Sequence, residues 1–348
     1  MGTEPAVSTV EEFKTSGGAR IFRLPLQAFP GLSGYVYLVL LNGDHGAGSW
    51  VLIDTGSGFG ESNRHLEEGF QAVSAQVGRP VTFSDLATIL ITHGHIDHIG
   101  GLSYLCSRTQ ARLGVHELDR RILTNYEERL TVVAGRLANF LVEAGVPEES
   151  REQVLAMYKM TKSLFHSVEV DFTYEAEGMR VGPFEMLHVP GHCAGHVVIR
   201  LHDVLFSGDH VLNDTSPHQA PERLTLSTGL DHYLRSLDAL LPWAEDVRLT
   251  LGGHKAPITD LPGRVAEIRS MHQERVSKVL DVLGEPHTIA EVSEALFGDV
   301  HGYNELLAVE EAGAHVEYLY QRGLLEITNL DVLEKQANPA PVLYRRLY

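Results

Sequence analysis

Four side chains that can bind a metal stand within six residues: His93, His95, Asp97 and His98. The apolar run at 87–92 precedes them, so we expect this segment to leave a buried strand and to enter a helix. At such a turn, His93 and His95 can serve one ion while Asp97 and His98 reach a second. Because a metal needs three or four converging donors, the remaining ligands must come from distant parts of the chain.

Candidates for those remaining ligands follow three other apolar runs. They are His192, Asp209 and His254, and each stands beside glycines that let the backbone turn closely. Together with the first segment, they supply five histidines and two aspartates at the ends of predicted strands. This donor set fits one binuclear site.

The composition indicates a globular protein and excludes several other classes. A chain of 348 residues with 43% hydrophobic and 21% charged residues suggests two domains, or one large domain with an appendage. Two cysteines cannot build a disulfide framework, and no apolar stretch is long enough to span a membrane. The N-terminus lacks an apolar leader, so we expect a cytoplasmic protein. The net charge of −18 disfavours binding to a phosphate backbone.

The predicted elements indicate a layered α/β protein. Residues 1–18 are small and polar, and we expect them to be flexible. Strands and helices alternate over 19–260, including a helix at about 61–77 and another at 98–107. Residues 117–166 interrupt this alternation with apolar residues at helical spacing, which predicts a helical insertion. The insertion either adds cover to the core or forms a lid over an active site.

Residues 261–348 show a different pattern, namely three helices followed by two short strands. This is the order of a winged helix, a fold that often binds DNA. The segment 263–348 nevertheless holds 8 Arg/Lys against 14 Asp/Glu, and its third predicted helix, at about 304–322, is acidic. A helix facing phosphates cannot carry that charge. We therefore expect a packing or interaction module, such as one wall of the substrate site or a dimer contact.

Five motifs occur in the order found in the metallo-β-lactamase superfamily, which this chain resembles over about residues 20–260. The glyoxalase II-like and lactamase-beta-2-like hydrolases of that superfamily are the most similar branch. The resemblance implies a four-layer αβ/βα sandwich, with the helical insertion and a C-terminal winged-helix-like domain added. The motifs are LIDTG (52–56), HGHIDH (93–98), PGHCAGH (190–196), FSGDH (206–210) and GGH (252–254).

The resemblance also implies a ligand set. Site one takes His93, His95 and His192, site two takes Asp97, His98 and His254, and Asp209 bridges the two ions. Two divalent ions are expected, with zinc first and iron or manganese as alternatives. A hydroxide held between the ions would attack the substrate, and Asp97 would orient it and accept its proton.

The expected activity is hydrolysis of a thioester, lactone or ester, so the expected partner is a small acyl compound. We expect no binding to a membrane, and the formation of a homodimer stays open. An endoribonuclease or phosphodiesterase is the main alternative, in which Lys255, Arg223 and Lys162 could contact phosphate. A mononuclear iron dioxygenase is disfavoured by the complete second set of ligands. A metal-binding protein without catalysis is the remaining alternative.

Several residues beside the motifs are candidates for supporting roles. Asp54 ends a predicted strand, and we expect it to orient loops near the metals. His188, His196 and His210 flank the motifs and could support ligands through hydrogen bonds. Cys193 follows His192, and we interpret it as a small packed residue rather than a nucleophile.

Overall fold

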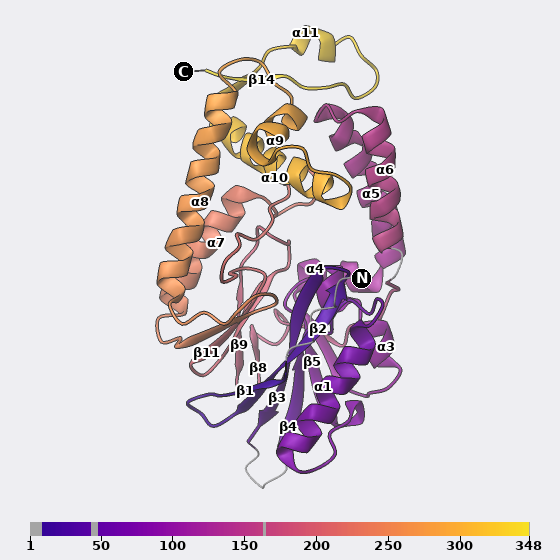
Figure 1. The fold of residues 1–348 in the computed structure, drawn as a ribbon, viewed down its shortest axis with the longest axis vertical. Helices are drawn as coiled ribbons and strands as arrows, with labels where there is room; N and C mark the ends of the chain where they lie inside the picture. Colours follow the sequence, from indigo (N-terminus) through magenta and orange to yellow (C-terminus); the bar gives the residue numbers. More distant parts are fainter. Residues whose placement is uncertain (1–8, 43–47, 163–164, 348) are drawn as a thin grey trace, which may run out of the picture.

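Two β-sheets pack face to face in the computed structural model, which describes residues 9–42, 48–162 and 165–347, with side chains of 161–162 excepted (Figure 1). Helices cover the outer face of each sheet, and a second body of helices lies at the upper end of this sandwich in the view of Figure 1. The predicted four-layer α/β architecture is therefore confirmed. Among the described helices, none has an apolar stretch of the length that a membrane crossing requires.

The first sheet has seven strands that neighbour one another in chain order. Strands β1 to β4 pair antiparallel, whereas β4 to β7 pair parallel, because helices connect these later strands. The strands are β1 (Glu11–Lys14), β2 (Arg20–Phe29), β3 (Leu32–Leu41), β4 (Ser49–Ile53), β5 (Leu86–Leu90), β6 (Arg112–Val115) and β7 (Phe172–Thr173).

The second sheet has five strands in the order β12-β11-β10-β9-β8. Only β11 and β12 pair parallel, since helix α7 (Leu230–Trp243) connects them. The strands are β8 (Arg180–Val181), β9 (Phe184–His188), β10 (Val197–Leu201), β11 (Val204–Gly208) and β12 (Leu249–Gly252).

The strands are apolar on both faces because each sheet is covered on both faces. On β4, Val51 and Ile53 pack against the second sheet, while Trp50 and Leu52 pack against helices. Helices α1 (Ser62–Val77), α2 (Ile96–Ile99) and α3 (Leu102–Cys106) cover the first sheet, together with the 3-10 turn Phe83–Asp85 and α4 (Glu117–Thr124). Helix α7 and the first half of α8 (Leu261–Val282) cover the second sheet.

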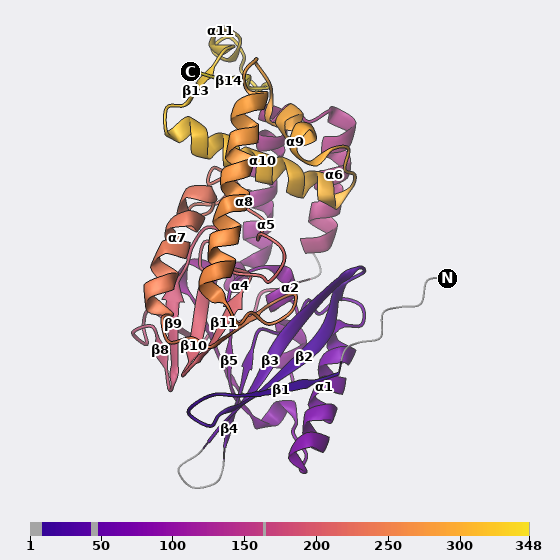
Figure 2. The same ribbon diagram turned by 60° about the vertical axis from the view of Figure 1, so that its left-hand side comes forward.

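The remaining helices form what we call the helical cap, made of residues 126–162 and 276–347. It contains α5 (Tyr126–Glu143), α6 (Glu148–Lys162), α9 (Ile289–Phe297), α10 (Tyr303–Gln321), α11 (Leu330–Leu333) and the antiparallel pair β13 (Leu325–Ile327) and β14 (Tyr344–Arg346). One apolar core joins residues of the insertion, such as Leu137 and Phe140, to C-terminal residues such as Val292 and Leu319. The insertion therefore shares its core with the C-terminal segment. Figure 2 shows α5 and α6 next to α9 and α10.

Two local predictions were wrong. Residues 11–14 form β1 and pair with β2, so that part of the N-terminus is ordered by the sheet. The helix expected at 98–107 is two short helices, and at the junction the N–H of Gly101 donates to the carbonyl of Gly56 at 2.9 Å, outside the helix. The carbonyls of Thr55 and Ser57 approach Gly100 and Gly101 so closely that a side chain would not fit there. The three predicted C-terminal helices and the two strands are present, but the short helix α11 lies between the strands, and the capping box at Thr288 begins α9. The division into separate domains stays a prediction.

Candidate metal centre

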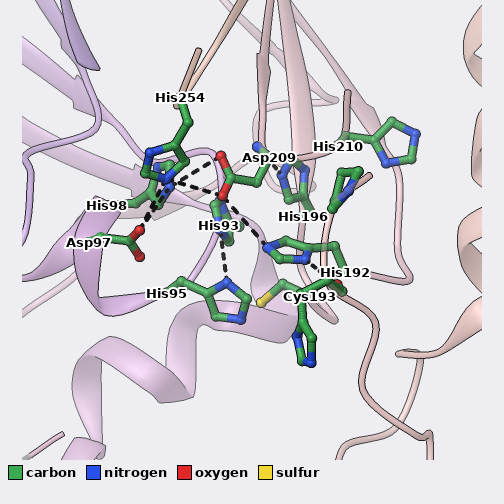
Figure 3. A network of polar contacts seen from close by, with 12 residues as sticks. His93, His95, Asp97, His98, His192, Cys193, His196, Asp209, His210 and His254 are labelled. Carbon is green, nitrogen blue, oxygen red and sulfur yellow. Dashed lines mark hydrogen bonds and ion pairs between the residues drawn. The ribbon is translucent and has the colours of Figure 1, made fainter. Parts of the chain in front are cut away.

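All seven predicted ligands lie together at one edge of the paired sheets (Figure 3). Each comes from the segment that follows a strand: β5 leads to His93 and His95 and then to Asp97 and His98 on α2, β9 leads to His192, β11 to Asp209 and β12 to His254. The site therefore lies between both sheets. Gly208 before Asp209 and Gly253 before His254 allow the backbone to pass close to the neighbouring side chains.

The first group consists of His93, His95 and His192, whose nitrogen atoms lie within 4.8 Å of one another. His93 Nε2 is 3.1 Å from His95 Nδ1. His93 is fully buried, and its pKa lies well below the ordinary value because of burial and because of the neighbouring histidines. A neutral imidazole keeps a nitrogen lone pair for a metal, so this group suits a divalent cation.

The second group consists of Asp97, His98, Asp209 and His254, which also lie within 4.8 Å of one another. Asp209 Oδ2 is 3.5 Å from His254 Nε2 and 3.9 Å from His192 Nε2, so this carboxylate faces both groups. Asp97 Oδ2 is 3.2 Å from His254 Nε2. The geometry places Asp209 between the two groups, where it can bridge two ions.

Three buried atoms of these groups lack a hydrogen-bond partner among the described residues. They are His98 Nε2, His192 Nε2 and Asp209 Oδ1. A buried polar atom without a partner costs free energy, and a metal bond would remove that cost. The residues present therefore fit a pair of divalent ions.

The carboxylates of the second group raise the pKa values of its two histidines. Burial opposes the charged form of His98, but Asp209, Asp54 and Asp97 raise its pKa well above the ordinary value. Burial likewise opposes the charge of His254, yet the carboxylates of Asp209 and Asp97 raise its pKa to about 9. Carboxylates that attract a proton so strongly also attract a divalent cation.

Asp54 follows β4, and we expected it to orient loops near the metals; in the structure it contacts the ring of His98. Its Oδ2 lies 2.8 Å from His98 Nδ1, and the backbone N–H and the hydroxyl of Thr92 donate to the same carboxylate. Asp54 has a φ of 60°, a left-handed conformation that is uncommon outside glycine. The carboxylate holds the ring so that Nε2 points into the site.

Backbone carbonyls orient two further ligands. His254 Nδ1 donates to the carbonyl of Ser33 at 2.7 Å, and His192 Nδ1 donates to the carbonyl of His218 at 2.6 Å. Each bond directs the Nδ1 proton to the carbonyl and turns Nε2 toward the other candidate ligands, where it can bind a metal. Ser33 and His218 lie outside the five motifs, and no local pattern marks them.

The flanking histidines differ in what they do. His196 Nε2 accepts the backbone N–H of Asp209 at 3.1 Å, and its ring stacks on His93. His188 Nε2 donates to the carbonyl of Ala194. His210 is buried, and neither ring nitrogen has a hydrogen-bond partner among the described residues. Only His196 therefore contacts ligands directly.

Asp119 in α4 is a supporting residue that the sequence did not indicate. Its carboxylate accepts the backbone N–H groups of Gly94 and Gly195, both at 2.8 Å, and the thiol of Cys193 at 3.2 Å. It thus connects the loops that carry His93, His95 and His192. Burial, with Asp119 beside it, raises the pKa of Cys193, which agrees with a packed thiol rather than a nucleophile.

A cavity of about 1640 Å³ opens from the two groups toward the helical cap. His95, Asp97, His192, Asp209 and His254 form part of its wall. Apolar side chains of α4, α5 and the C-terminal helices also line it, among them Ile122, Leu130, Val133, Leu137, Phe297 and Leu306. The insertion therefore provides both core packing and a wall above the site.

Two of the three cations that could contact phosphate are already paired with carboxylates. Lys255 Nζ lies 3.3 Å from Asp214, and Arg223 pairs with Glu143. The side chain of Lys162 is outside the described residues. Arg129 on α5 also lines the cavity, and no carboxylate of the described residues forms an ion pair with it.

Comparisons with known proteins agree with this geometry. A sequence profile of the Metallo-beta-lactamase superfamily matches residues 30–254. A relative from Bacillus subtilis (strain 168), "Probable metallo-hydrolase YqjP", is 27% identical over 302 residues, which are 82% of this chain and 88% of the relative. The "Atrochrysone carboxyl ACP thioesterase" of Aspergillus chevalieri is 25% identical over 265 residues, which are 72% of this chain and 65% of that protein.

A solved structure resembles almost the whole chain. A metallo-beta-lactamase family protein from Thermus thermophilus has a TM-score of 0.71 and 28% sequence identity, and the alignment covers 94% of this chain and 98% of that one. The similarity includes the helical cap, because the sandwich alone would cover a smaller share of the chain.

Proposed function

The chain belongs to the metallo-β-lactamase superfamily, and on this premise we propose that it is a binuclear metal-dependent hydrolase of a thioester, a lactone or an ester. The observation that carries the proposal is the convergence of seven candidate ligand side chains beside a cavity with apolar walls, with buried Nε2 and Oδ1 atoms that lack a hydrogen-bond partner among the described residues.

We assign the ligands as the two groups suggest. One ion would be held by His93, His95 and His192, and the other by Asp97, His98 and His254, with Asp209 shared between them. Zinc is the first choice for a site rich in histidine, with iron or manganese as alternatives. Bound there, the metals would supply Lewis acidity and would lower the pKa of a coordinated water.

The protein's own residues contribute orientation and proton transfer. Burial raises the pKa of Asp97, but His98, His254 and His95 lower it more, so this carboxyl stays ionised near neutral pH. An ionised Asp97 in the wall of the cavity can orient a water molecule and accept its proton. Asp54 and the carbonyls of Ser33 and His218 hold the ligand rings in place throughout this step.

The cavity supports an acyl substrate rather than RNA. Its apolar wall of α5 and the C-terminal helices suits a hydrocarbon chain, and burial of each CH₂ group contributes about 0.8 kcal/mol. The name of the Aspergillus chevalieri relative is that of a thioesterase. The ribonuclease alternative needs cations for phosphates, whereas Lys255 and Arg223 are paired with carboxylates.

A substrate panel tests this proposal. Purified protein loaded with zinc would be given an acyl thioester, a homoserine lactone, bis-p-nitrophenyl phosphate and single-stranded RNA. We expect hydrolysis of the thioester or the lactone, loss of that activity in a chelator, and recovery when zinc is returned. Cleavage of RNA alone would replace our proposal with the ribonuclease alternative, and full activity in the chelator would refute metal dependence.

A further inference from the structure

One peptide group connects the candidate metal centre to the helical cap. The carbonyl of His218 accepts a hydrogen bond from His192 Nδ1 at 2.6 Å. The N–H of Gln219, which belongs to the same peptide group, donates to Glu311 Oε2 at 2.7 Å. Glu311 lies on α10, 6% exposed, and thus reaches the ligand His192 through a single rigid peptide.

Residues on either side of this peptide group are held by hydrogen bonds to α8 and α10. Arg275 on α8 donates both to Glu311 Oε1 at 3.0 Å and to the hydroxyl of Ser216 at 2.8 Å. The ring of His218 donates through Nε2 to the carbonyl of Leu307 at 3.1 Å. The segment 216–219 is therefore attached to α8 and α10 on both sides of the peptide group.

A second explanation for Glu311 would be a metal site of its own, because His272, Glu311 and His315 lie within 4.8 Å of one another. His272 Nδ1 and His315 Nε2 instead form a hydrogen bond of 3.2 Å. Both oxygen atoms of Glu311 are already bound, and the cation of Arg275 lies beside one of them. These bonds engage both carboxylate oxygens of Glu311, and both ring nitrogens of His315 are bonded as well, so that among the atoms of this group only His272 Nε2 lacks a hydrogen-bond partner among the described residues.

We propose that Glu311 is a positioning residue for the metal ligand His192 and acts through the peptide group between His218 and Gln219. This inference rests on the proposed function, because it takes His192 to be a ligand. A carboxylate usually orients a metal-binding histidine by direct contact. Here the peptide stands between the two side chains.

The physical reason is polarisation and restraint. Hydrogen bonds to a charged acceptor are about twice as strong as neutral ones, and linked hydrogen bonds polarise one another. The carboxylate of Glu311 therefore makes the carbonyl of His218 a stronger acceptor for His192 Nδ1. That bond holds the His192 ring in the tautomer whose Nε2 can bind an ion.

Glu317 provides a matched control on the same helix. Its Oε2 accepts the N–H of Glu222, a residue of the same long loop, at 2.7 Å. The peptide group that it holds begins at Pro221, whose carbonyl accepts from Leu224 and Thr228 rather than from a metal ligand. Truncation of Glu317 removes a similar bond to the same loop without touching the path to His192.

Metal titration tests the proposal without a substrate. Zinc and cobalt would be titrated into the metal-free full-length protein and into Glu311→Ala, Glu311→Gln and Glu317→Ala, against a chelating dye. We expect Glu311→Ala to weaken the binding of one of two ions by about 10-fold to 100-fold. Glu311→Gln keeps an acceptor for Gln219 but loses the charge, so its loss should be smaller. Glu317→Ala should bind both ions as the wild type does.

Equal affinity of Glu311→Ala and the wild type would overturn the proposal, as would an equal loss in Glu317→Ala. If Glu311→Ala does not fold, the comparison of Glu311→Gln with Glu317→Ala decides in its place. If the wild type binds no ion, the proposed function fails. The effect of Glu311 on the hydrogen bond of His192 Nδ1 can then still be tested by NMR. In metal-free protein with ¹⁵N-labelled histidine, the Nδ1 proton of His192 should move upfield in Glu311→Gln, and an unchanged signal would refute the link.

Discussion

The β-sandwich and the helical cap contribute to the site in different ways. The sandwich supplies all seven candidate ligand side chains, from loops at strand ends and from the short helix α2, and most of their supports, such as Asp54 and Ser33, are also its own. The cap supplies no ligand of these two groups, but it walls the cavity and reaches His192 through Glu311. The chemistry thus belongs to the sandwich, whereas substrate fit and one point of ligand alignment belong to the cap.

The sharpest way to break this division is to remove the shared ligand. Asp209→Ala should lose ions from both groups, because Asp209 lies between His192 and His254. We expect activity to fall by more than the roughly 10-fold to 100-fold typical of supporting residues. Elemental analysis and thioester hydrolysis would be measured together. Near-normal hydrolysis with less than one ion per chain would contradict the binuclear scheme.

Removal of a support within the sandwich should have the next largest effect. Asp54→Ala frees the ring of His98 and leaves the buried N–H and hydroxyl of Thr92 without their acceptor. Metal affinity should fall by about 10-fold to 100-fold, as measured by competition with a chelating dye. Asp238→Ala, a substitution at an exposed site on α7, serves as the control. If both variants bound metal equally well, Asp54 would have no role in alignment.

A substitution in the cap wall should change substrate preference and leave the metals in place. Val133 lines the cavity, and Val133→Trp should raise KM for a dodecanoyl thioester by about 10-fold more than for an acetyl thioester. Val132 is the adjacent residue on α5, 46% exposed and outside the cavity lining, so Val132→Trp is the matched control. Equal effects on the two substrates would mean that α5 only supports the fold.

A smaller effect is expected at Arg129, the cavity cation without an ion-pair partner among the described residues. Arg129→Ala should raise KM for a glutaryl thioester about 3-fold to 10-fold and leave KM for a valeryl thioester unchanged, since a charged hydrogen bond contributes about 1.5–3 kcal/mol before exposure reduces it. Arg129→Lys should restore part of the preference. An identical KM shift for both thioesters would remove Arg129 from substrate recognition.

The contrast between the sandwich and the helical cap also explains which parts of the site could be predicted from the sequence and which could not. The convergence of the seven candidate ligands could be predicted because each stands in a short motif at the end of an apolar run, as His93 and His254 do. For Glu311, the sequence indicated only that it adds to the negative charge of a helix, a charge that disfavours DNA binding. Its function depends on a contact across 92 residues, to Gln219, and no local pattern encodes such a contact. For the same reason, the shared core of residues 126–162 and the C-terminal helices was not foreseen.

Anomalous diffraction from crystals of zinc-loaded protein tests the central claim most directly. We predict two peaks per chain, one among His93, His95 and His192 and the other among Asp97, His98 and His254, with Asp209 touching both. A chain that hydrolyses its substrate at full rate with no peak at these side chains, or with the metal bound elsewhere, would contradict the account.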